Sequence, residues 1–285
     1  MDLALAVFLL LLCAVGIGAG LLGSLAGLGG GIVLVPALVL GFGVPLVDAI
    51  GASAVSVLAT STTTGSAYVR DHLTDVRIGM FLEIATVPGA LVGVVATLVL
   101  TRSGLSSILL VGLGVLLLAT LPGSWRSAET STVSLTPDDR SRRLGLTGSY
   151  HDQRRGTDVS YQAARTNPAL ATMFGAGLVS GMFAIGSGVL KVLALERFLG
   201  LPPKVATATS NFMIGVTVAA SSGVLLLAGS VNPVLVAPVA LGTVGGSLLG
   251  SRLLPAMSDH RLRLIFLAVV AVLGVELILR GGGWA

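Results

Sequence analysis

Charged side chains are scarce in this chain of 285 residues, in which Asp, Glu, Lys and Arg make up 11%. An ordinary soluble protein carries about a quarter charged residues, so this chain cannot cover a water-facing surface. The hydrophobic content of 54% agrees with this. The composition excludes a soluble enzyme, a disordered chain and a nucleic-acid-binding protein. It predicts an integral membrane protein, most of which lies in the lipid bilayer.

Cysteine and aromatic residues are also rare. The single cysteine, Cys13, excludes a disulfide framework or a cysteine metal site within one chain, and we predict no cofactor and no metal site. Because aromatic residues make up only 5% of the chain, small residues must fill its interior. The 39 glycines fit this expectation, since transmembrane helices tolerate glycine better than soluble helices do.

Long apolar runs are present on both sides of a polar break. A helix that crosses the hydrocarbon needs about 20 apolar residues, and two of the runs, 31–43 and 188–200, are too short for this. The polar break, 124–167, mixes arginines with acids and has almost no periodic apolar residues. It predicts a flexible loop, with a regulatory or docking role as the less favoured alternative. The other apolar runs are 3–25, 45–68, 78–100, 105–122, 169–185, 204–228, 233–254 and 262–279.

The two groups of apolar runs repeat one another. The sequence Gly18-Ala19-Gly20-Leu21 recurs as Gly175-Ala176-Gly177-Leu178, an offset of 157, and the same offset pairs Pro45 with Pro202 and Thr60 with Thr217. We therefore predict an all-α membrane protein with two five-segment repeats, 1–123 and 168–285, joined by a polar linker, 124–167. An odd number of crossings inverts the second repeat. The inversion holds whether the glycine-broken hairpin that opens each repeat re-enters or crosses fully.

The basic residues predict the orientation, because cytoplasmic loops hold most of the Lys and Arg of a membrane protein. If 124–167 is cytoplasmic, the loops 69–77 and 251–263 and the residues Lys191, Arg197 and Lys204 fall on the same side. Of the 17 basic residues, only Arg102 and Arg280 then lie outside. We expect both termini outside.

Two glycine elbows are the sharpest local feature. Gly27-Leu28-Gly29-Gly30-Gly31 and its repeat, Ala184-Ile185-Gly186-Ser187-Gly188, each stand between a long run and a short one. Paired interrupted segments in two halves indicate a transporter's binding site. The first N–H groups of a helix that starts inside the membrane are unpaired and attract anions without any lysine. We favour such a site, near the bilayer midplane, over close helix packing alone.

Polar residues follow each elbow. Ser53, Thr209, Ser210 and Asn211 are predicted to contact an anion, whereas 60–64 (Thr-Ser-Thr-Thr-Thr) is expected to pack. Carboxylates inside membranes are candidate proton carriers. Glu83 is the better candidate for coupling to a proton or sodium ion, and Asp48 the weaker one because it lies near a segment end.

Further motifs accompany the elbows: GLGGG is followed by Val35-Pro36, and the chain also contains the stretches 49–53 and 206–211 and Pro88-Gly89 with Gly93. In these motifs the sequence resembles the TauE/SafE family. The family consists of bacterial anion transporters associated with export of sulfite and organosulfonates such as sulfoacetate. The resemblance covers both repeats but not 124–167, and it implies location in the bacterial inner membrane. By position, it implies these substrate-binding residues: Gly29, Gly30, Gly31, Ser53, Gly186, Ser187, Gly188, Thr209, Ser210 and Asn211.

The predicted function is a secondary transporter of a small anion, either sulfite or an organosulfonate, that exports by alternating access. An anion channel is the alternative, since opposed half-helices also build pores. An intramembrane enzyme is disfavoured because His72, His151 and His260 fall in loops and leave Ser187 without a base. A primary pump would need a GK[ST] phosphate loop, which the chain lacks, so a pump would require a separate ATPase subunit, an alternative that the sequence leaves open. Expected partners are the anion, the lipid bilayer and a second copy in a homodimer, with no nucleic acid.

Overall fold

The computed structural model describes the chain except for residues 1–2, 27–28, 127–136, 153–156, 254–258 and 284–285. Helices dominate it, and the long apolar runs form helices close to the predicted bounds. In chain order, the first half comprises α1 (Leu3–Ala26), α2 (Gly31–Pro36) continued by the π-helix η1 (Ala37–Gly41), α3 (Leu46–Arg70), α4 (Val76–Arg102) and α5 (Ser106–Arg126). The linker forms α6 (Asp139–Leu144), β1 (Thr147–Asp152) and β2 (Thr157–Gln162). The second half comprises α7 (Thr166–Phe183), α8 (Gly188–Arg197), α9 (Pro203–Leu227), α10 (Pro233–Leu253) and α11 (Asp259–Gly281).

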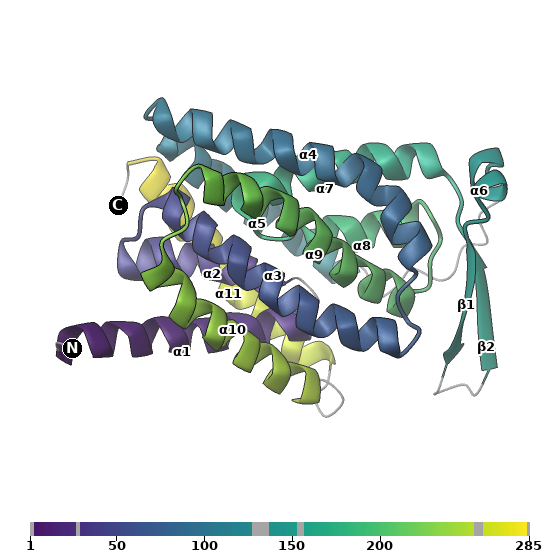
Figure 1. The fold of residues 1–285 in the computed structure, drawn as a ribbon, viewed down its shortest axis with the longest axis horizontal. Helices are drawn as coiled ribbons and strands as arrows, with labels where there is room; N and C mark the ends of the chain where they lie inside the picture. Colours follow the sequence, from purple (N-terminus) through teal and green to yellow (C-terminus); the bar gives the residue numbers. More distant parts are fainter. Residues whose placement is uncertain (1–2, 27–28, 127–136, 153–156, 254–258, 284–285) are drawn as a thin grey trace.

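Five helices among the described residues are long and apolar enough to cross a membrane, namely α1, α3, α4, α9 and α10. They lie side by side in one bundle (Figure 1). The segment from α2 through η1, at 1.5 Å per residue, spans only about 16 Å of the roughly 30 Å hydrocarbon. Helix α8, with 10 residues, is as short. The chain is thus a multi-pass membrane protein that contains two short internal helices.

Helix boundaries in the two halves fall at the same spacing. Gly31 and Gly188 begin the two short helices, and Leu46 and Pro203 begin the long helices that follow, each pair 157 residues apart. Proline precedes both of these long helices in nearly the same conformation, with φ −53° and ψ 139° at Pro45 and φ −58° and ψ 142° at Pro202. Proline fits this position because its fixed φ suits a helix start.

The helices of one half pack mainly against those of the other. The most extensive contacts are α1 with α10 and α4 with α7, which correspond to one another under the same spacing, followed by α5 with α11 and α3 with α9. Figure 1 shows α4 beside α7 along one edge of the bundle and α1 beside α10 along the opposite edge. Each half therefore completes its core with the other half.

Glycines let the outer pairs of helices approach closely. A Cβ at Gly89 would meet the carbonyl oxygen of Phe174, and a Cβ at Gly246 would meet that of Ile17. A Cβ at Gly93 would likewise meet the carbonyl oxygen of Leu178. Each such glycine permits backbone-to-backbone packing that any side chain would block. Packing thus accounts for much of the glycine excess.

The prediction of a flexible loop is wrong for the described part of 124–167. Residues 147–152 and 157–162 form an antiparallel hairpin with Gly148 opposite Tyr161, and α6 precedes it. The hairpin is anchored by backbone hydrogen bonds from Ala163 to Leu146 and from Ala164 to Leu199. Leu146 and Ala163 are buried in an apolar cluster with residues of α4, α7, α8 and α9. The linker gains its order from this tertiary packing, which its own composition does not announce.

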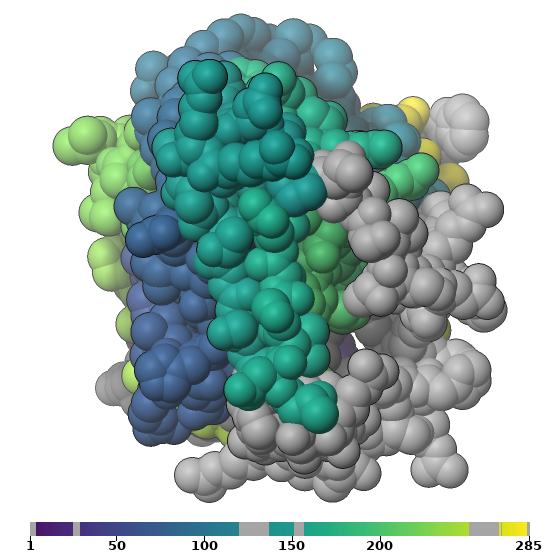
Figure 2. All heavy atoms as spheres, turned by 90° about the vertical axis from the view of Figure 1, so that its right-hand side faces the viewer, coloured from purple at the N-terminus to yellow at the C-terminus, as the bar shows by residue number. Residues whose placement is uncertain are grey.

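The linker lies at one end of the bundle. Helix α1 begins and α11 ends at the opposite end (Figure 1), and Figure 2 shows the hairpin lying across the near end. Tyr161 Oη donates a hydrogen bond of 3.0 Å to Asp75 Oδ2, and Asp75 Oδ1 accepts from the backbone N–H of Ile78 at the start of α4. Burial, the charge of Asp75 and this hydrogen bond raise the pKa of Tyr161, so the phenol stays protonated and donates.

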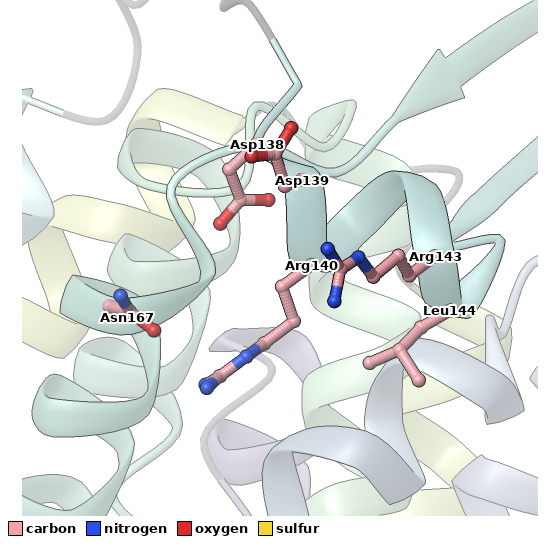
Figure 3. Close-up of a pocket in the computed structure, with 6 residues that line it drawn as sticks. All are labelled: Asp138, Asp139, Arg140, Arg143, Leu144 and Asn167. Atoms are coloured by element: carbon pink, nitrogen blue, oxygen red, sulfur yellow. The ribbon is translucent and has the colours of Figure 1, made fainter.

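A pocket of about 560 Å³ lies between α6 and the start of α7. Figure 3 shows Arg140 reaching across it toward α7. This charged pocket lies at the linker end of the bundle, near the start of α7. The elbow of the second half follows the other end of α7, so the pocket and the elbow are separate. The pocket is lined by Asp138, Asp139, Arg140, Arg143, Leu144 and Asn167.

Candidate functional site

Both glycine elbows adopt left-handed backbone conformations. Gly29 and Gly30 each have φ of 77°, and Gly186 has φ of 76°. Gly27 and Leu28 lie outside the described residues. In the second elbow, Ala184 and Ser187 also have positive φ, at 51° and 45°. Left-handed backbone costs a non-glycine residue about 1–2 kcal/mol, so the surrounding structure holds this elbow under strain, a condition found most often at functional sites.

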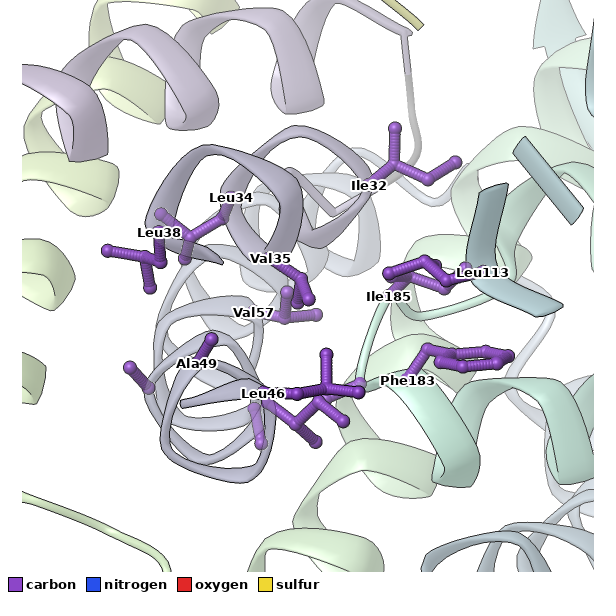
Figure 4. Packing of buried hydrophobic residues seen from close by; sticks show 14 of the residues in the cluster. Ile32, Leu34, Val35, Leu38, Leu46, Ala49, Val57, Leu113, Phe183 and Ile185 are labelled. Atoms are coloured by element: carbon purple, nitrogen blue, oxygen red, sulfur yellow. The ribbon is translucent and has the colours of Figure 1, made fainter. Parts of the chain in front are cut away.

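The two elbows meet in the middle of the bundle. A Cβ at Gly31 would lie 2.6 Å from the carbonyl oxygen of Ala184 and 2.9 Å from Cα of Ile185. Cβ atoms at Gly29 and Gly186 would lie 3.5 Å and 2.9 Å from Cγ2 of the same residue, Ile214 of α9. Figure 4 shows Ile185, next to Leu113, among the buried apolar residues here. The structure thus brings together Gly29, Gly31 and Gly186 from opposite halves.

One face of α3 holds both elbows. Ser53 Oγ donates to the carbonyl oxygen of Ala184 at 2.9 Å, and Thr60 Oγ1 lies 3.3 Å from that of Gly29. Ser56 lies between them on this face, fully buried, and its Oγ has no hydrogen-bond partner among the described residues. Sequence reasoning missed Ser56, although its spacing of three from Ser53 and four from Thr60 marks one helix face. Thr60, assigned to packing, is an elbow contact.

In this conformation the side chains of the second half that were predicted to contact an anion form hydrogen bonds within the protein. Ser187 Oγ donates to the carbonyl oxygen of Ala176 at 2.6 Å, and Ser210 Oγ to that of Gly188 at 3.4 Å. Thr209 Oγ1 instead accepts from the backbone N–H of Asp75, at the linker end. Asn211 Nδ2 donates to the carbonyl oxygen of Thr207 in its own helix. Ser187, Gly188 and Ser210 are therefore neighbours, whereas Thr209 and Asn211 make their contacts elsewhere.

A buried charged group lies beside the second elbow. Lys191, predicted from the sequence to be among the basic residues on the cytoplasmic side, is fully buried within the bundle. Its Nζ lies 3.7 Å from Oε1 of Glu83, whose side chain is 4% exposed. Thr217 Oγ1 accepts a hydrogen bond from Lys191 Nζ at 2.5 Å and lies 2.9 Å from Glu83 Oε1. These three residues come from α8, α4 and α9, so no local pattern could join them.

The second coupling candidate, Asp48, does not belong to this group. It lies in the first turn of α3 and is partly exposed, where a carboxylate is favoured by the helix N-terminus. Among the histidines, His151 lies in β1 and His260 in the first turn of α11, rather than in loops as predicted. The hydroxyl of Ser187 donates its hydrogen bond to the carbonyl oxygen of Ala176.

The arrangement suits binding of a small anion more than bond-making chemistry. Helix α8 starts inside the bundle, and its first N–H groups have no partner within the helix and carry a partial positive charge. The buried ammonium of Lys191 adds a full charge one turn farther along the same helix. Hydroxyl groups of Ser53 on α3 and Ser210 on α9 donate to carbonyl oxygens of the second elbow.

Comparison with known proteins agrees with this picture. The chain is 28% identical over 279 residues to the probable membrane transporter protein YunE of Bacillus subtilis, covering 95% of this chain and 97% of that one. It is 33% identical over 105 residues to the probable membrane transporter protein YjnA of the same organism, covering 36% and 40%. No solved structure matches it significantly. The family model for the sulfite exporter TauE/SafE matches residues 12–277, so the chain belongs to this family of membrane transporters, as its motifs indicated.

Proposed function

We propose that this protein is a secondary transporter of small anions, with sulfite or an organosulfonate such as sulfoacetate as substrate and export as its direction. The observation that carries the proposal is the meeting of the two elbows, where Gly31 of one half lies against Ala184 and Ile185 of the other. A site formed by two interrupted helices from two halves is a recurring design of secondary transporters. The membership in the sulfite exporter family supports the substrate class.

Transport would proceed by alternating access between two inverted repeats. The helix boundaries of the two halves are equally spaced, and the pair α1–α10 is equivalent to the pair α7–α4 at this spacing. Both observations support a two-fold relation between the halves. The shortness of α2–η1 and of α8 supports re-entrant hairpins that bring the elbows near the midplane. In the described conformation Ser53, Ser187 and Ser210 donate to carbonyl oxygens of the protein, so rocking of one half against the other would free them for the anion.

The charges and the arrangement of the chain at the two ends of the bundle support the proposed orientation. The hairpin and the termini lie at opposite ends of the bundle (Figure 1), which supports a cytoplasmic linker and external termini in the bacterial inner membrane. The buried Glu83 supports a proton rather than sodium as the coupling ion, because among the described residues it faces an ammonium group and not a set of oxygen ligands.

Uptake of radiolabelled sulfite and sulfoacetate into liposomes that contain the purified protein tests the proposal. We expect saturable uptake that accelerates when unlabelled substrate is loaded on the opposite side. Current without saturation or trans-stimulation would identify an anion channel instead. Liposomes that show neither uptake nor current with either anion would refute the proposed function. Gly223, with no atom near its missing Cβ, offers the control variant Gly223→Ala, for which we expect wild-type uptake.

A further inference from the structure

Lys191 is a buried cation whose hydrogen-bonding capacity is only partly used. An ammonium group has three N–H donors, and its single hydrogen bond among the described residues goes to Thr217 Oγ1. Glu83 Oε1 lies 3.7 Å away, an ion contact longer than a hydrogen bond. The side chain is fully buried. A buried ammonium group with donors that no described residue uses can bind a further acceptor.

Glu83 is held by a partner that it must share. Both carboxylate oxygens, at 2.9 and 3.1 Å, and the carbonyl oxygen of Met213, at 2.7 Å, lie within reach of the Thr217 hydroxyl. One hydroxyl proton serves one acceptor at a time. The carboxylate is therefore bound by one contested hydrogen bond and one long ion contact, which is weak attachment for a buried charge.

The positions equivalent to this pair show that the fold does not require these charges. At the spacing of 157, Leu34 corresponds to Lys191 and Ala240 to Glu83, while Thr60 corresponds to Thr217. Leu34 is fully buried and packs among apolar side chains (Figure 4). Apolar residues in place of a buried ion pair are often as stabilising or more so, and charge inside a membrane is costly. The pair, which joins the two halves, is therefore kept for a purpose that the equivalent positions Leu34 and Ala240 do not serve.

The position of the pair links it to the elbow. The backbone N–H of Lys191 donates to the carbonyl oxygen of Ser187, so the ammonium belongs to the first turn of α8. Thr217 follows Ile214 by one turn of α9, and Ile214 packs against Gly186. The backbone of Lys191 thus lies about one helical turn, or 5–6 Å, from the elbow.

We propose that Lys191 is the cationic ligand of the transported anion and that Glu83 is the internal anion that occupies it when substrate is absent. This rests on the proposed function. A small oxyanion displaces Glu83 from Lys191, and the released carboxylate, left without its counter-charge in a low-dielectric site, takes up a proton from a hydronium ion on the side from which the anion enters. An O–H bond of the hydronium ion breaks as one forms on Glu83, leaving water. When the anion leaves on the other side, Glu83 returns the proton to water there and the pair re-forms. One proton therefore crosses with each anion.

Among the residues that the structure describes, the helices packed around Glu83 bring no competing titratable group close to it. Helix α7, its main neighbour, has none in its sequence, and α9 has only Lys204, in its first turn. On α8, Glu196 and Arg197 lie more than a turn beyond Lys191. Helices α3 and α5 touch α4 less extensively, and their charged residues lie in their end turns. Lys191 is thus the charged group that faces Glu83.

The test introduces the residues that the protein itself carries at the equivalent positions. Lys191→Leu combined with Glu83→Ala reproduces Leu34 and Ala240, and Glu83→Gln removes only the proton carrier. Arg197→Leu is the matched control, since it removes a positive charge from the exposed end of the same helix. Each variant is reconstituted in liposomes with a pH-sensitive dye inside. The probe is whichever of sulfite and sulfoacetate the wild type transports, with exchange of labelled for unlabelled anion and net proton movement measured together.

We expect the double variant to lose at least tenfold in anion exchange while it unfolds at or above the wild-type temperature. Glu83→Gln should retain exchange and move no protons with the anion, and Arg197→Leu should stay within twofold of wild type in both. Lys191→Met with Glu83→Gln, which preserves side-chain volume, replaces the double variant if that one does not fold. Exchange at the wild-type rate without Lys191, or proton movement without Glu83, overturns the inference. A wild type that transports neither anion overturns the proposed function instead.

Discussion

Gly31 offers the sharpest test of the contact between the two elbows. In Gly31→Ala the new Cβ would lie 2.6 Å from the carbonyl oxygen of Ala184, 2.8 Å from Ser53 Oγ and 2.9 Å from Cα of Ile185. Two of these atoms are backbone of the opposite half, and the Ser53 hydroxyl is bonded to Ala184. None can retreat cheaply, so we expect overpacking to cost about 1–3 kcal/mol of unfolding free energy.

Gly18→Ala is the matched control. Gly18 lies inside α1 with no atom within 4 Å of the position that a Cβ would take. An alanine there should be neutral or should stabilise the helix by about 0.5–1 kcal/mol. The two variants differ by the same methyl group, so a difference between them reports the surroundings rather than the substitution.

Thermal unfolding in detergent measures both variants. A thiol-reactive dye on the single cysteine, Cys13, follows the transition, since Cys13 is partly buried in α1. Gly31→Ala should melt below wild type and should also slow anion exchange, because it lies where the elbows must move. If Gly31→Ala unfolds at a temperature equal to or above that of Gly18→Ala, the elbows do not touch and the candidate site is wrong.

Two further predictions concern the linker. Partial burial raises the pKa of Asp138, but hydrogen bonds from Thr166 and Ser141 outweigh it and hold that pKa below its ordinary value of 3.8. Its stabilising effect is therefore complete above about pH 4 and is lost as the pH falls through the lowered value; amide exchange of α6 at several pH values should show this loss, and a flat profile would contradict it. Tyr161→Phe removes the hydrogen bond to Asp75 and should cost about 1.5–3 kcal/mol, so exchange in β1 and β2 should quicken while that of α4 holds. Unchanged hairpin exchange would refute the anchoring role.

Much of the fold could be predicted from the sequence because the hydropathy along the chain largely decides which segments form helices in a membrane. Apolar runs of about 20 residues must become helices in lipid, and the bounds of α3 and α9 follow the runs 45–68 and 204–228 within two residues. The two elbows were predictable for a related reason, since a cluster of glycines interrupts a helix locally. Their left-handed conformations at Gly30 and Gly186 confirm the interruption.

The candidate site was predictable only in part. Glycines and hydroxyls near the elbows carried a local signal, but their partners did not. Ser53 was expected to contact an anion, and its hydroxyl holds the carbonyl oxygen of Ala184 from the other half. Thr209 reaches the start of α4 rather than an elbow. Whether a hydroxyl faces a ligand, a neighbouring backbone or its own helix depends on which helix faces are opposed, and an individual segment does not carry that information.

The sequence by itself determined the membrane location, the helical segments, the internal repeat and the family, because each depends on local hydropathy or on motifs a few residues long. The tertiary structure alone decided that Lys191 is buried against Glu83, that α1 packs on α10 and α4 on α7, and that the linker folds as a hairpin over one end. Counting basic residues along the chain placed Lys191 near an aqueous surface. In the structure its ammonium group meets a carboxylate and a hydroxyl from two distant helices, and only the packed bundle brings those groups together.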